Sequence, residues 1–489
     1  MQFEPVIGLE VHAELATQSK MFCACPVVDS TQAEPNSAVC PVCAGMPGTL
    51  PVLNRRAVEY GLRVALALEC EVAPMSIFAR KNYFYPDLPK GYQISQYEQP
   101  LARNGRLIIQ TSQGERTIRI RRVHLEEDTG KLTHCQVNGE SYSLVDLNRA
   151  GIPLLEIVSE PDLHTAEEVR LYAMALRSLL RYLGVNSGDM QKGVMRVEPN
   201  ISVRLSDSPT LGVRTEIKNL NSFRALERAV AYEIQRQSEI LSRGEEVIQE
   251  TRGWDEAQGK TFVQRTKEEA EDYRYFPEPD LPPLIVDEKL IAEIRASLPE
   301  LPAAKLQRFQ MQYGLNAYSV GVLTAEPAVA EYFEQTARAC QAASAKMAAN
   351  WISGELFGLL NQAGLEIEAS PVSPTALAEL IDMVARGEIN QNAAKTTLVE
   401  MFVGGETAQT IVAARGLRQI SDADQIAQWV QRVLNENPEQ VAAYYKGKAT
   451  LAKWLFGQVM RLAKGRANPQ TIQEELEKQL NARQPPDAP

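Results

Sequence analysis

The chain has 489 residues, which exceeds the size at which a single hydrophobic core stops growing, so we expect two to four domains. Its composition is 44% hydrophobic and 23% charged, as in ordinary soluble enzymes, and its net charge of -11 argues against a protein that coats nucleic acid. We find no apolar run of about 18 residues and no basic-then-apolar leader, so we expect a cytoplasmic protein that does not contact a membrane.

The first predicted element is a β-strand in VIGLEVHAEL, residues 6–15, where apolar and polar residues alternate. Because side chains along a strand alternate between its two faces, Glu10 and His12 share the polar face. The opposite face carries Ile7, Leu9, Val11 and Ala13. Taken alone, this pattern is typical of a strand with one solvated face.

Four cysteines follow in FCACP and AVCPVCAG. Cys23-x-Cys25 is separated by fourteen residues from Cys40-x-x-Cys43. Two close pairs joined by a loop are typical of a structural zinc site with four thiolate ligands. Unbound thiols or a redox pair are the alternative, and the spacing favours zinc over both.

An aromatic loop is predicted in RKNYFYPDLPKGYQISQ, residues 80–96, which combines lysines with tyrosines and prolines. Such a loop can simply pack on its domain. The functional alternative is that it presents Lys81 to an anionic ligand.

The next predicted strand is TIRIRRVHLEEDTGK, residues 117–131, in which a histidine precedes three acids. Strict alternation predicts that one face carries Ile118, Ile120, Arg122, His124 and Glu126. Glu127 breaks the period where the strand meets its turn, and the sequence leaves open which of Glu126 and Glu127 binds metal.

Two further predicted strands also carry acids on a polar face. LLEIVSEPD contributes Glu156, and MRVEPNISVRL contributes Arg196 and Glu198. Carboxylates close together raise one another's pKa unless a cation compensates them, so several acid-bearing strands in one domain indicate Mg²⁺ or Mn²⁺. Ions held in this way usually carry nucleotide phosphates in their open positions.

A strand-to-helix junction is predicted in TEIKNLNSF, where Lys218 precedes the helix and Ser222 is its N-cap. A lysine beside a helix N-terminus also suits an anion, so we assign Lys218, Arg196 and Glu198 to cofactor contacts. The chain contains no phosphate-binding G-x-x-x-x-G-K-[ST] loop, no G-x-G-x-x-G after a strand and no amidase motif. Any ATP must therefore be held by metals and carboxylates.

Beyond the proline-rich YFPEPDLPPLIVD the sequence becomes helical. We predict an α+β domain over residues 1–287, a helical domain over 288–415 and a small helical tail domain over 416–489. The segment YYKGKATLAKWLFGQVMRLAKGRANP contains six lysines and arginines and no acid. The segment is equally consistent with contact to RNA phosphates and with a solvated helix face over a hydrophobic core. We assign RNA binding to Lys446, Lys448, Lys464 and Arg466.

These stretches, in this order, resemble the B subunit of the bacterial and organellar aspartyl/glutamyl-tRNA amidotransferase over nearly the whole chain. The resemblance is carried by VIGLEVHAEL, RKNYFYPDLPKGYQISQ, HLEEDTGK, SLVDLNRAGIPLLEIVSEPD, EIKNLNSF, DYRYFPEPDLP and GQVMRLAKGRANP. It implies a cradle domain of mixed or antiparallel sheet related to glutamine synthetase, followed by a helical domain and a tail that holds tRNA.

The resemblance also implies the reaction. ATP phosphorylates the side-chain carboxylate of glutamate or aspartate mischarged onto tRNA(Gln) or tRNA(Asn), and ammonia then displaces the phosphate. A separate amidase subunit supplies the ammonia and a small third subunit completes a heterotrimer, in the cytoplasm or in a eukaryotic organelle.

By position, the family's kinase site falls on Glu10, His12, Glu126, Glu127 and Glu156, with Lys81 in its aromatic loop. We expect Mg²⁺ at Glu10, His12, Glu127 and Glu156. The zinc assignment rests on spacing more than on the family, since only some members have the four cysteines.

Two other functional classes remain open, a two-metal phosphoesterase acting on RNA and a non-catalytic tRNA-binding scaffold. A phosphoesterase would need neither ATP nor a partner, and a scaffold would tolerate loss of the carboxylates. A related archaeal-type subunit carries an inserted domain for which this chain has no room. Whether Glu-tRNA, Asp-tRNA or both is the substrate depends on which synthetases the cell contains.

Overall fold

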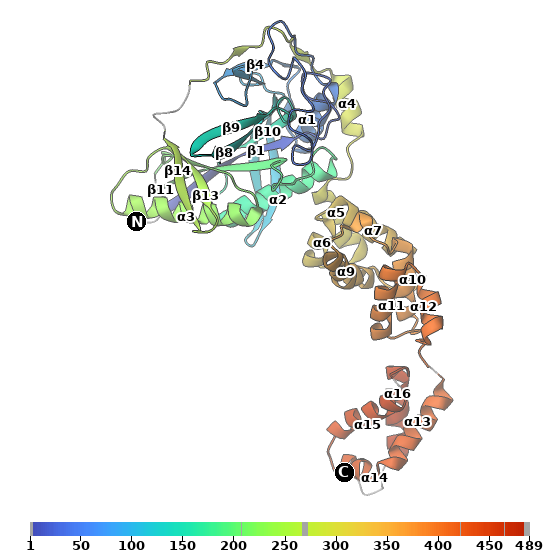
Figure 1. The fold of residues 1–489 in the computed structure, drawn as a ribbon. Coiled ribbons are helices and arrows are strands. Elements are labelled where there is room, and N and C mark those ends of the chain that lie inside the picture. The colour runs from blue at the N-terminus through green and yellow to red at the C-terminus, as the bar shows by residue number, and fades with distance from the viewer. Residues whose placement is uncertain (1–2, 207, 267–271, 421, 464, 484–489) are drawn as a thin grey trace. The chain divides into compact units, whose positions relative to one another are not determined.

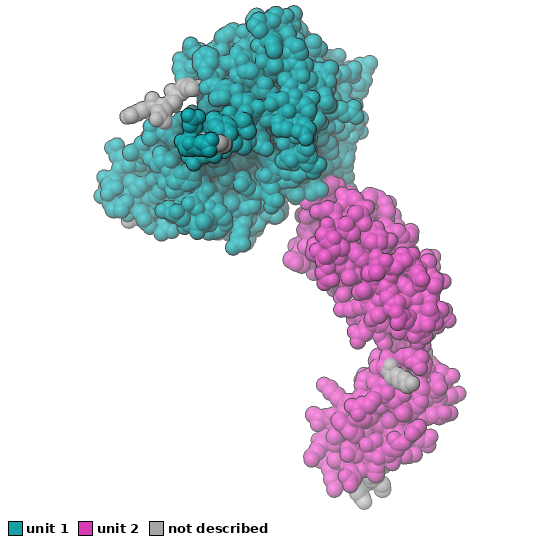
Figure 2. Space-filling view, in the orientation of Figure 1, with its two compact units in different colours: residues 1–302 teal, residues 303–489 magenta. Residues whose placement is uncertain are grey.

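A computed structural model describes residues 3–206, 208–266, 272–420, 422–463 and 465–483. The chain divides into two compact units, residues 1–302 and residues 303–489, which are coloured separately in Figure 2. No helix in the described ranges is both long enough and apolar enough to cross a bilayer.

The first unit is built on a mixed sheet of nine strands in the order β14-β13-β12-β11-β1-β10-β7-β6-β2. All neighbouring strands are antiparallel except β12 and β13, which are parallel. The strands are β1 (Phe3–Glu14), β2 (Glu71–Val72), β6 (Ala102–Thr111), β7 (Gly114–Glu127), β10 (Pro153–Ser159), β11 (Met195–Leu205), β12 (Thr215–Lys218), β13 (Glu250–Asp255) and β14 (Lys260–Thr266).

Three helices cover one face of this sheet, as Figure 1 shows for α2 and α3: α1 (Arg55–Ala67), α2 (Ala166–Tyr182) and α3 (Phe223–Ser242). The alternation in β1 is as predicted, since Ile7, Leu9 and Val11 are fully buried in the core beneath these helices. The predicted N-cap is also confirmed, because Ser222 Oγ accepts from the backbone N–H of Ala225 at the start of α3. Helices packed on a largely antiparallel sheet give the α+β class.

Strand β7 departs from the predicted alternation. Its register against β10 shifts between Val158 and Ser159, which is a β-bulge. Ile118 and Ile120 are buried in the core before the bulge, and Val123 and Leu125 take over that role after it. The prediction that Ile118 and Ile120 share a face with Arg122, His124 and Glu126 is therefore wrong. The extra residue moves the later even-numbered side chains to the opposite face of the sheet.

Smaller elements complete the first unit. A three-stranded sheet has the order β15-β4-β5, β16 pairs with β3, and β8 forms a hairpin with β9. Their bounds are β3 (Met75–Ser76), β4 (Ala79–Asn82), β5 (Tyr92–Ser95), β8 (Lys131–Val137), β9 (Glu140–Asp146), β15 (Phe276–Pro277) and β16 (Leu284–Ile285). Helix α4 (Glu288–Ala296) packs on α1 and buries Ile294 in the same core, so the unit continues beyond the expected boundary at 287.

The second unit is helical, as predicted, and contains two separate hydrophobic cores. The first core lies among α5 (Pro302–Tyr313), α6 (Ala317–Thr324), α7 (Pro327–Ala339), α8 (Ala345–Asn350), a π-helical turn η2 (Trp351–Leu356), α9 (Phe357–Ala363), a short turn η3 (Ile367–Ala369), α10 (Pro374–Ala385), α11 (Gln391–Gly404) and α12 (Ala408–Arg415). The second core lies among α13 (Ala423–Glu436), α14 (Pro438–Tyr445), α15 (Thr450–Leu462) and α16 (Pro469–Ala482).

A buried carboxylate fixes the chain between α7 and α8. Asp382 on α10 is 3% exposed and accepts the backbone N–H groups of Gln341, Ala342 and Ala343 at 2.7, 2.9 and 2.8 Å. Burial alone would raise the pKa of Asp382, but these three donors hold it below its usual value of 3.8. The ionised carboxylate thus holds the loop through three charge-assisted hydrogen bonds to its backbone N–H groups.

We predict that Asp382→Ala lowers the unfolding free energy of the helical unit by about 2 kcal/mol, because three backbone N–H groups of the loop lose a charged acceptor. Since the pKa is lower in the folded chain, this contribution is present above pH 3.8 and is lost as the pH falls through the folded-state value. Urea unfolding of the full chain followed by circular dichroism measures the effect. Glu379→Ala, at an exposed position of the same helix, is the control, and an equal loss in both variants would contradict the prediction.

Candidate functional site

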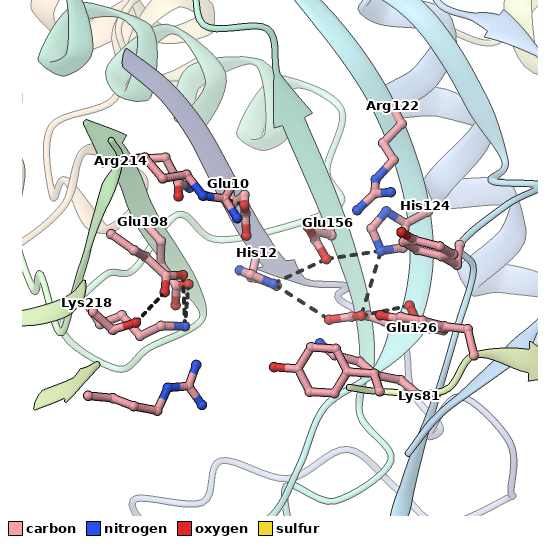
Figure 3. A pocket seen from close by; sticks show the side chains of 18 of the residues that line it. Glu10, His12, Lys81, Arg122, His124, Glu126, Glu156, Glu198, Arg214 and Lys218 are labelled. Atoms are coloured by element: carbon pink, nitrogen blue, oxygen red, sulfur yellow. Dashed lines mark hydrogen bonds and ion pairs between the residues drawn. The ribbon is translucent and has the colours of Figure 1, made fainter. Parts of the chain in front are cut away.

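A cavity of about 340 Å³ lies on the face of the nine-stranded sheet opposite the helices. Its polar lining comes from β1, β4, β5, β7, β10, β11, β12, β13 and β14 (Figure 3). Among the described residues, six glutamates line it: Glu10, Glu126, Glu156, Glu198, Glu216 and Glu250. Five lysines and arginines of the same described ranges also line it: Lys81, Arg122, Arg214, Lys218 and Arg265.

One group of possible metal ligands lies on the three adjacent strands β1, β10 and β7. His12 Nε2 is 3.7 Å from Glu126 and 3.5 Å from Glu156, because His12 is paired with Glu156 across the sheet. His124, paired with Glu156 on the other side, approaches the same carboxylate at 3.0 Å. Ser95 on β5 donates to Glu126 at 3.0 Å and orients it.

The histidines and glutamates of this group stabilise each other's charged forms. Burial alone would lower the pKa of His12, but Glu156 outweighs it and raises the pKa to about 9. Burial likewise opposes ionisation of Glu156, yet His124 and His12 hold the pKa of Glu156 well below its usual range. The histidines thus supply positive charge to the carboxylates, which is what a divalent cation does when it displaces their protons.

A second group of possible ligands consists of Glu10, Glu198 and Glu216 on β1, β11 and β12, with one oxygen of each within 4.8 Å of the others. Lys218 contacts Glu198 at 2.9 Å and Glu216 at 3.2 Å. Burial and the charge of Glu156 raise the pKa of Glu10 above its usual range. A second cation would relieve that repulsion.

Lys81 lines the cavity, as the functional alternative for its segment expected, but it does so from strand β4, since β4 and β5 form the two ends of the expected loop. Its side chain makes cation-π contacts. Its Nζ lies 4.9 Å from the ring centre of Tyr273 and 5.7 Å from that of Tyr83. Burial alone would lower the pKa of Lys81, but Glu126 and its neighbours raise it, so the side chain stays charged.

Two expected site residues lie elsewhere. Glu127 points away from the metal-type ligands, because adjacent residues of a strand face opposite sides, and it forms an ion pair with Lys90. It also accepts the backbone N–H of Ile94 at 3.0 Å. The geometry therefore favours Glu126 over Glu127 as the ligand. Arg196 is tied to Asp128 at 3.0 Å and does not line the cavity.

Several cavity residues received no role from the sequence, and three charged or titratable ones matter most here. His124 and Arg122 precede Glu126 on the face that the bulge exposes, and the bulge has no signature in the sequence. Glu216 could have been found, since it stands two residues before Lys218 on a strand and must share its face.

The four cysteines expected to bind zinc come together. Their Sγ atoms all lie within 4.8 Å of one another, and Cys43 is 3.9 Å from both Cys25 and Cys40. Tetrahedral zinc with Zn–S near 2.3 Å needs sulfurs about 3.8 Å apart. The cluster is thus of the right size for a zinc ion. Lys20, which is fully buried, places its Nζ 3.6 Å from Cys43 Sγ.

The cationic residues expected to contact RNA belong to the part of the chain that forms the second core of the helical unit, α13 to α16. Lys446 and Lys448 are exposed just after α14. Arg466 is also exposed, and its Nη1 donates to the carbonyl of Gly416 at 3.3 Å. Lys464 lies outside the described residues.

Comparison with known proteins decides the family. Residues 5–292 match the GatB/GatE catalytic domain, and residues 331–480 match the GatB domain. The B subunit of aspartyl/glutamyl-tRNA(Asn/Gln) amidotransferase from Thermomicrobium roseum is 54% identical over 98% of this chain and 99% of its own length. The chain belongs to the family of aspartyl/glutamyl-tRNA amidotransferase B subunits.

Other members of this family are nearly as similar. The protein of the same name from Myxococcus xanthus is 52% identical over 98% of both chains. That from Thermodesulfovibrio yellowstonii is 51% identical over 97% of this chain and 98% of its own. The catalytic-domain match covers all residues found to line the cavity, so the cavity belongs to the family's catalytic domain.

Proposed function

We propose that this chain is the component of a tRNA-dependent amidotransferase that phosphorylates the side-chain carboxylate of Glu-tRNA(Gln), Asp-tRNA(Asn) or both and converts it to the amide. The observation that carries the proposal is the presence of two groups of hard metal ligands in one cavity, flanked by cations. Such an arrangement suits ATP, whose phosphates fill the open coordination positions of divalent ions.

The residues fit Mg²⁺ on their donor chemistry. Carboxylate oxygens are its preferred ligands, and Nε2 of His12 faces the carboxylates of Glu126 and Glu156. We assign one ion to His12, Glu126 and Glu156 and a second to Glu10, Glu198 and Glu216. Bound cations would neutralise the charge that develops on the transferring phosphoryl group.

The chain's own side chains divide the remaining tasks. Lys81 and Lys218 carry positive charge at the cavity wall and stabilise anionic groups there. His124 orients Glu156, and Ser95 orients Glu126. A carboxylate is a poor electrophile, and phosphorylation provides the leaving group that ammonia then displaces.

Partner proteins supply what the chain does not contain. The sequence has no amidase motif, so we propose that ammonia comes from a glutamine amidase subunit in a complex completed by a small third subunit. The relatives are named as one subunit of an amidotransferase, which supports such an assembly.

Loss of a ligand in the first group should abolish amidation. In the complex with its amidase, and with ammonium chloride as the nitrogen source, we expect Glu156→Gln to lower ATP-dependent conversion of Glu-tRNA(Gln) by about 100-fold or more. Glu160→Gln, which removes a surface partner of Arg121, is the control and should retain activity. Full activity of Glu156→Gln, or RNA cleavage without ATP by the wild type, would refute the proposal.

The cysteine cluster is proposed to hold a structural zinc ion. Four thiolates and an ion of charge +2 leave a net charge of about −2, and the buried ammonium of Lys20 offsets part of it. Because all four positions of a tetrahedral ion are filled by sulfur, this ion would not take part in the reaction.

We expect one zinc per chain in the wild type and none in Cys40→Ser, measured by elemental analysis. Cys135→Ser, outside the cluster, is the control and should keep the metal. Lys20→Met should release zinc faster to a chelator, because the thiolate charge is no longer offset. Equal zinc content in Cys40→Ser and the wild type would exclude the site.

We propose that exposed lysines and arginines of the region α13 to α16 contact tRNA phosphates. We expect the double variant Lys446→Ala/Lys448→Ala to raise the KM for Glu-tRNA(Gln) and to spare glutamine hydrolysis. The salt dependence of tRNA binding should fall by about one unit of slope for each phosphate that the variant no longer binds. Lys478→Ala, an exposed lysine on α16, is the control. An unchanged KM and slope in the double variant would refute this role.

A further inference from the structure

Arg122 differs from the other arginines of β7. Each of the others is engaged by a carboxylate, in the pairs Arg116–Glu168 at 3.4 Å, Arg119–Asp162 at 2.6 Å and Arg121–Glu160 at 2.8 Å. Arg122 lines the cavity and forms no ion pair with any described residue. Among the arginines of β7, Arg122 is therefore the one whose guanidinium is available to pair with a bound anion.

The side chain of Arg122 is nevertheless held in place. Its guanidinium carbon lies 5.7 Å from the centre of the Tyr97 ring, which stacks on Tyr275 at 4.2 Å with an angle of 8° between the rings. Its Nε is buried and has no acceptor among the described residues. A buried donor without a partner is costly, so this orientation is best explained by an acceptor that arrives with a substrate.

The position of Arg122 narrows the choice of acceptor. Arg122 lies with His124 and Glu156 at one end of the cavity, whereas Lys218 and Arg214 lie with Glu198 at the other (Figure 3). The planar guanidinium matches a carboxylate with two parallel hydrogen bonds, while a lysine acts as a point charge. The two ends of the cavity thus offer different kinds of anion contact.

We infer that Arg122 binds the side-chain carboxylate of the aminoacyl group on tRNA and positions it for phosphorylation, an inference that rests on the proposed function. Arg122 donates to the carboxylate and fixes its plane. One carboxylate oxygen then forms a bond to the γ-phosphorus of ATP as the bond from that phosphorus to ADP breaks, and ADP leaves with the electron pair. The bulge in β7 brings Arg122 into the cavity for this purpose.

The first test is a comparison of two equilibrium affinities, for Glu-tRNA(Gln) and for the same tRNA without its amino acid, in the complete complex without ATP. We expect the wild type to prefer the charged tRNA by about tenfold, as for a charge-assisted hydrogen-bonded pair, and Arg122→Gln to lose that preference. Arg121→Gln, the neighbouring surface arginine, should keep it. A preference retained in Arg122→Gln would overturn the inference.

Steady-state kinetics show whether Arg122 binds the carboxylate of the aminoacyl group or the phosphates of ATP. Arg122→Gln should raise the KM for Glu-tRNA(Gln) by about tenfold and leave the KM for ATP unchanged. Added guanidinium should partly restore Arg122→Gly. A rise in the KM for ATP alone would assign Arg122 to the nucleotide and overturn the inference.

A measurement on the wild-type protein tests the same contact without a substitution, so its result does not depend on whether a variant folds. Glu-tRNA(Gln), but not uncharged tRNA, should protect Arg122 from modification by phenylglyoxal, as read from the modified peptides. Equal protection by both tRNAs would contradict carboxylate binding. Failure of the proposed function itself would be distinct, because the wild-type complex would then show no ATP-dependent amidation at all.

Discussion

Carboxylates that are withdrawn from water must be compensated by positive charge, and the first unit is organised around this requirement. Glu126 and Glu156 are buried on a sheet whose other face is the hydrophobic core, so they cannot turn toward solvent. His12 on β1 approaches both carboxylates, and His124 on β7 approaches Glu156 on β10. Lys218 on β12 forms an ion pair with Glu198 on β11. Divalent cations would relieve the repulsion that remains, which is why we propose the cavity as their site.

The bulge in β7 is the local feature that assembles this arrangement. Without it, the parity set by Ile118 and Ile120 would direct Arg122, His124 and Glu126 into the core. A core cannot hold three such groups unpaired, so the bulge and the charged face depend on each other. The same inserted residue leaves Glu127 on the far side, where Lys90 neutralises it. Alternation places the two adjacent glutamates on opposite faces of the sheet, and the bulge decides which of them lines the cavity.

Local patterns in the sequence predicted a large part of this structure. Period two in β1 and β11 placed Glu10, His12 and Glu198 on the cavity face, and spacing alone brought the four cysteines together. The failures concern information that is not local. Neither a bulge nor the packing of α4 on α1 can be read from residue types, since both are decided by partner strands and helices. The pairing of Arg196 with Asp128 escaped prediction for the same reason.

We propose that the cavity phosphorylates the carboxylate of an aminoacyl-tRNA. The most direct measurement follows oxygen from the carboxylate: Glu-tRNA(Gln) labelled with ¹⁸O in its side-chain carboxylate is amidated by the complete complex with ATP and ammonia, and the phosphate released is analysed by mass spectrometry. If the carboxylate is phosphorylated before ammonia attacks, the inorganic phosphate carries ¹⁸O. Unlabelled phosphate alongside amide formation would contradict the account.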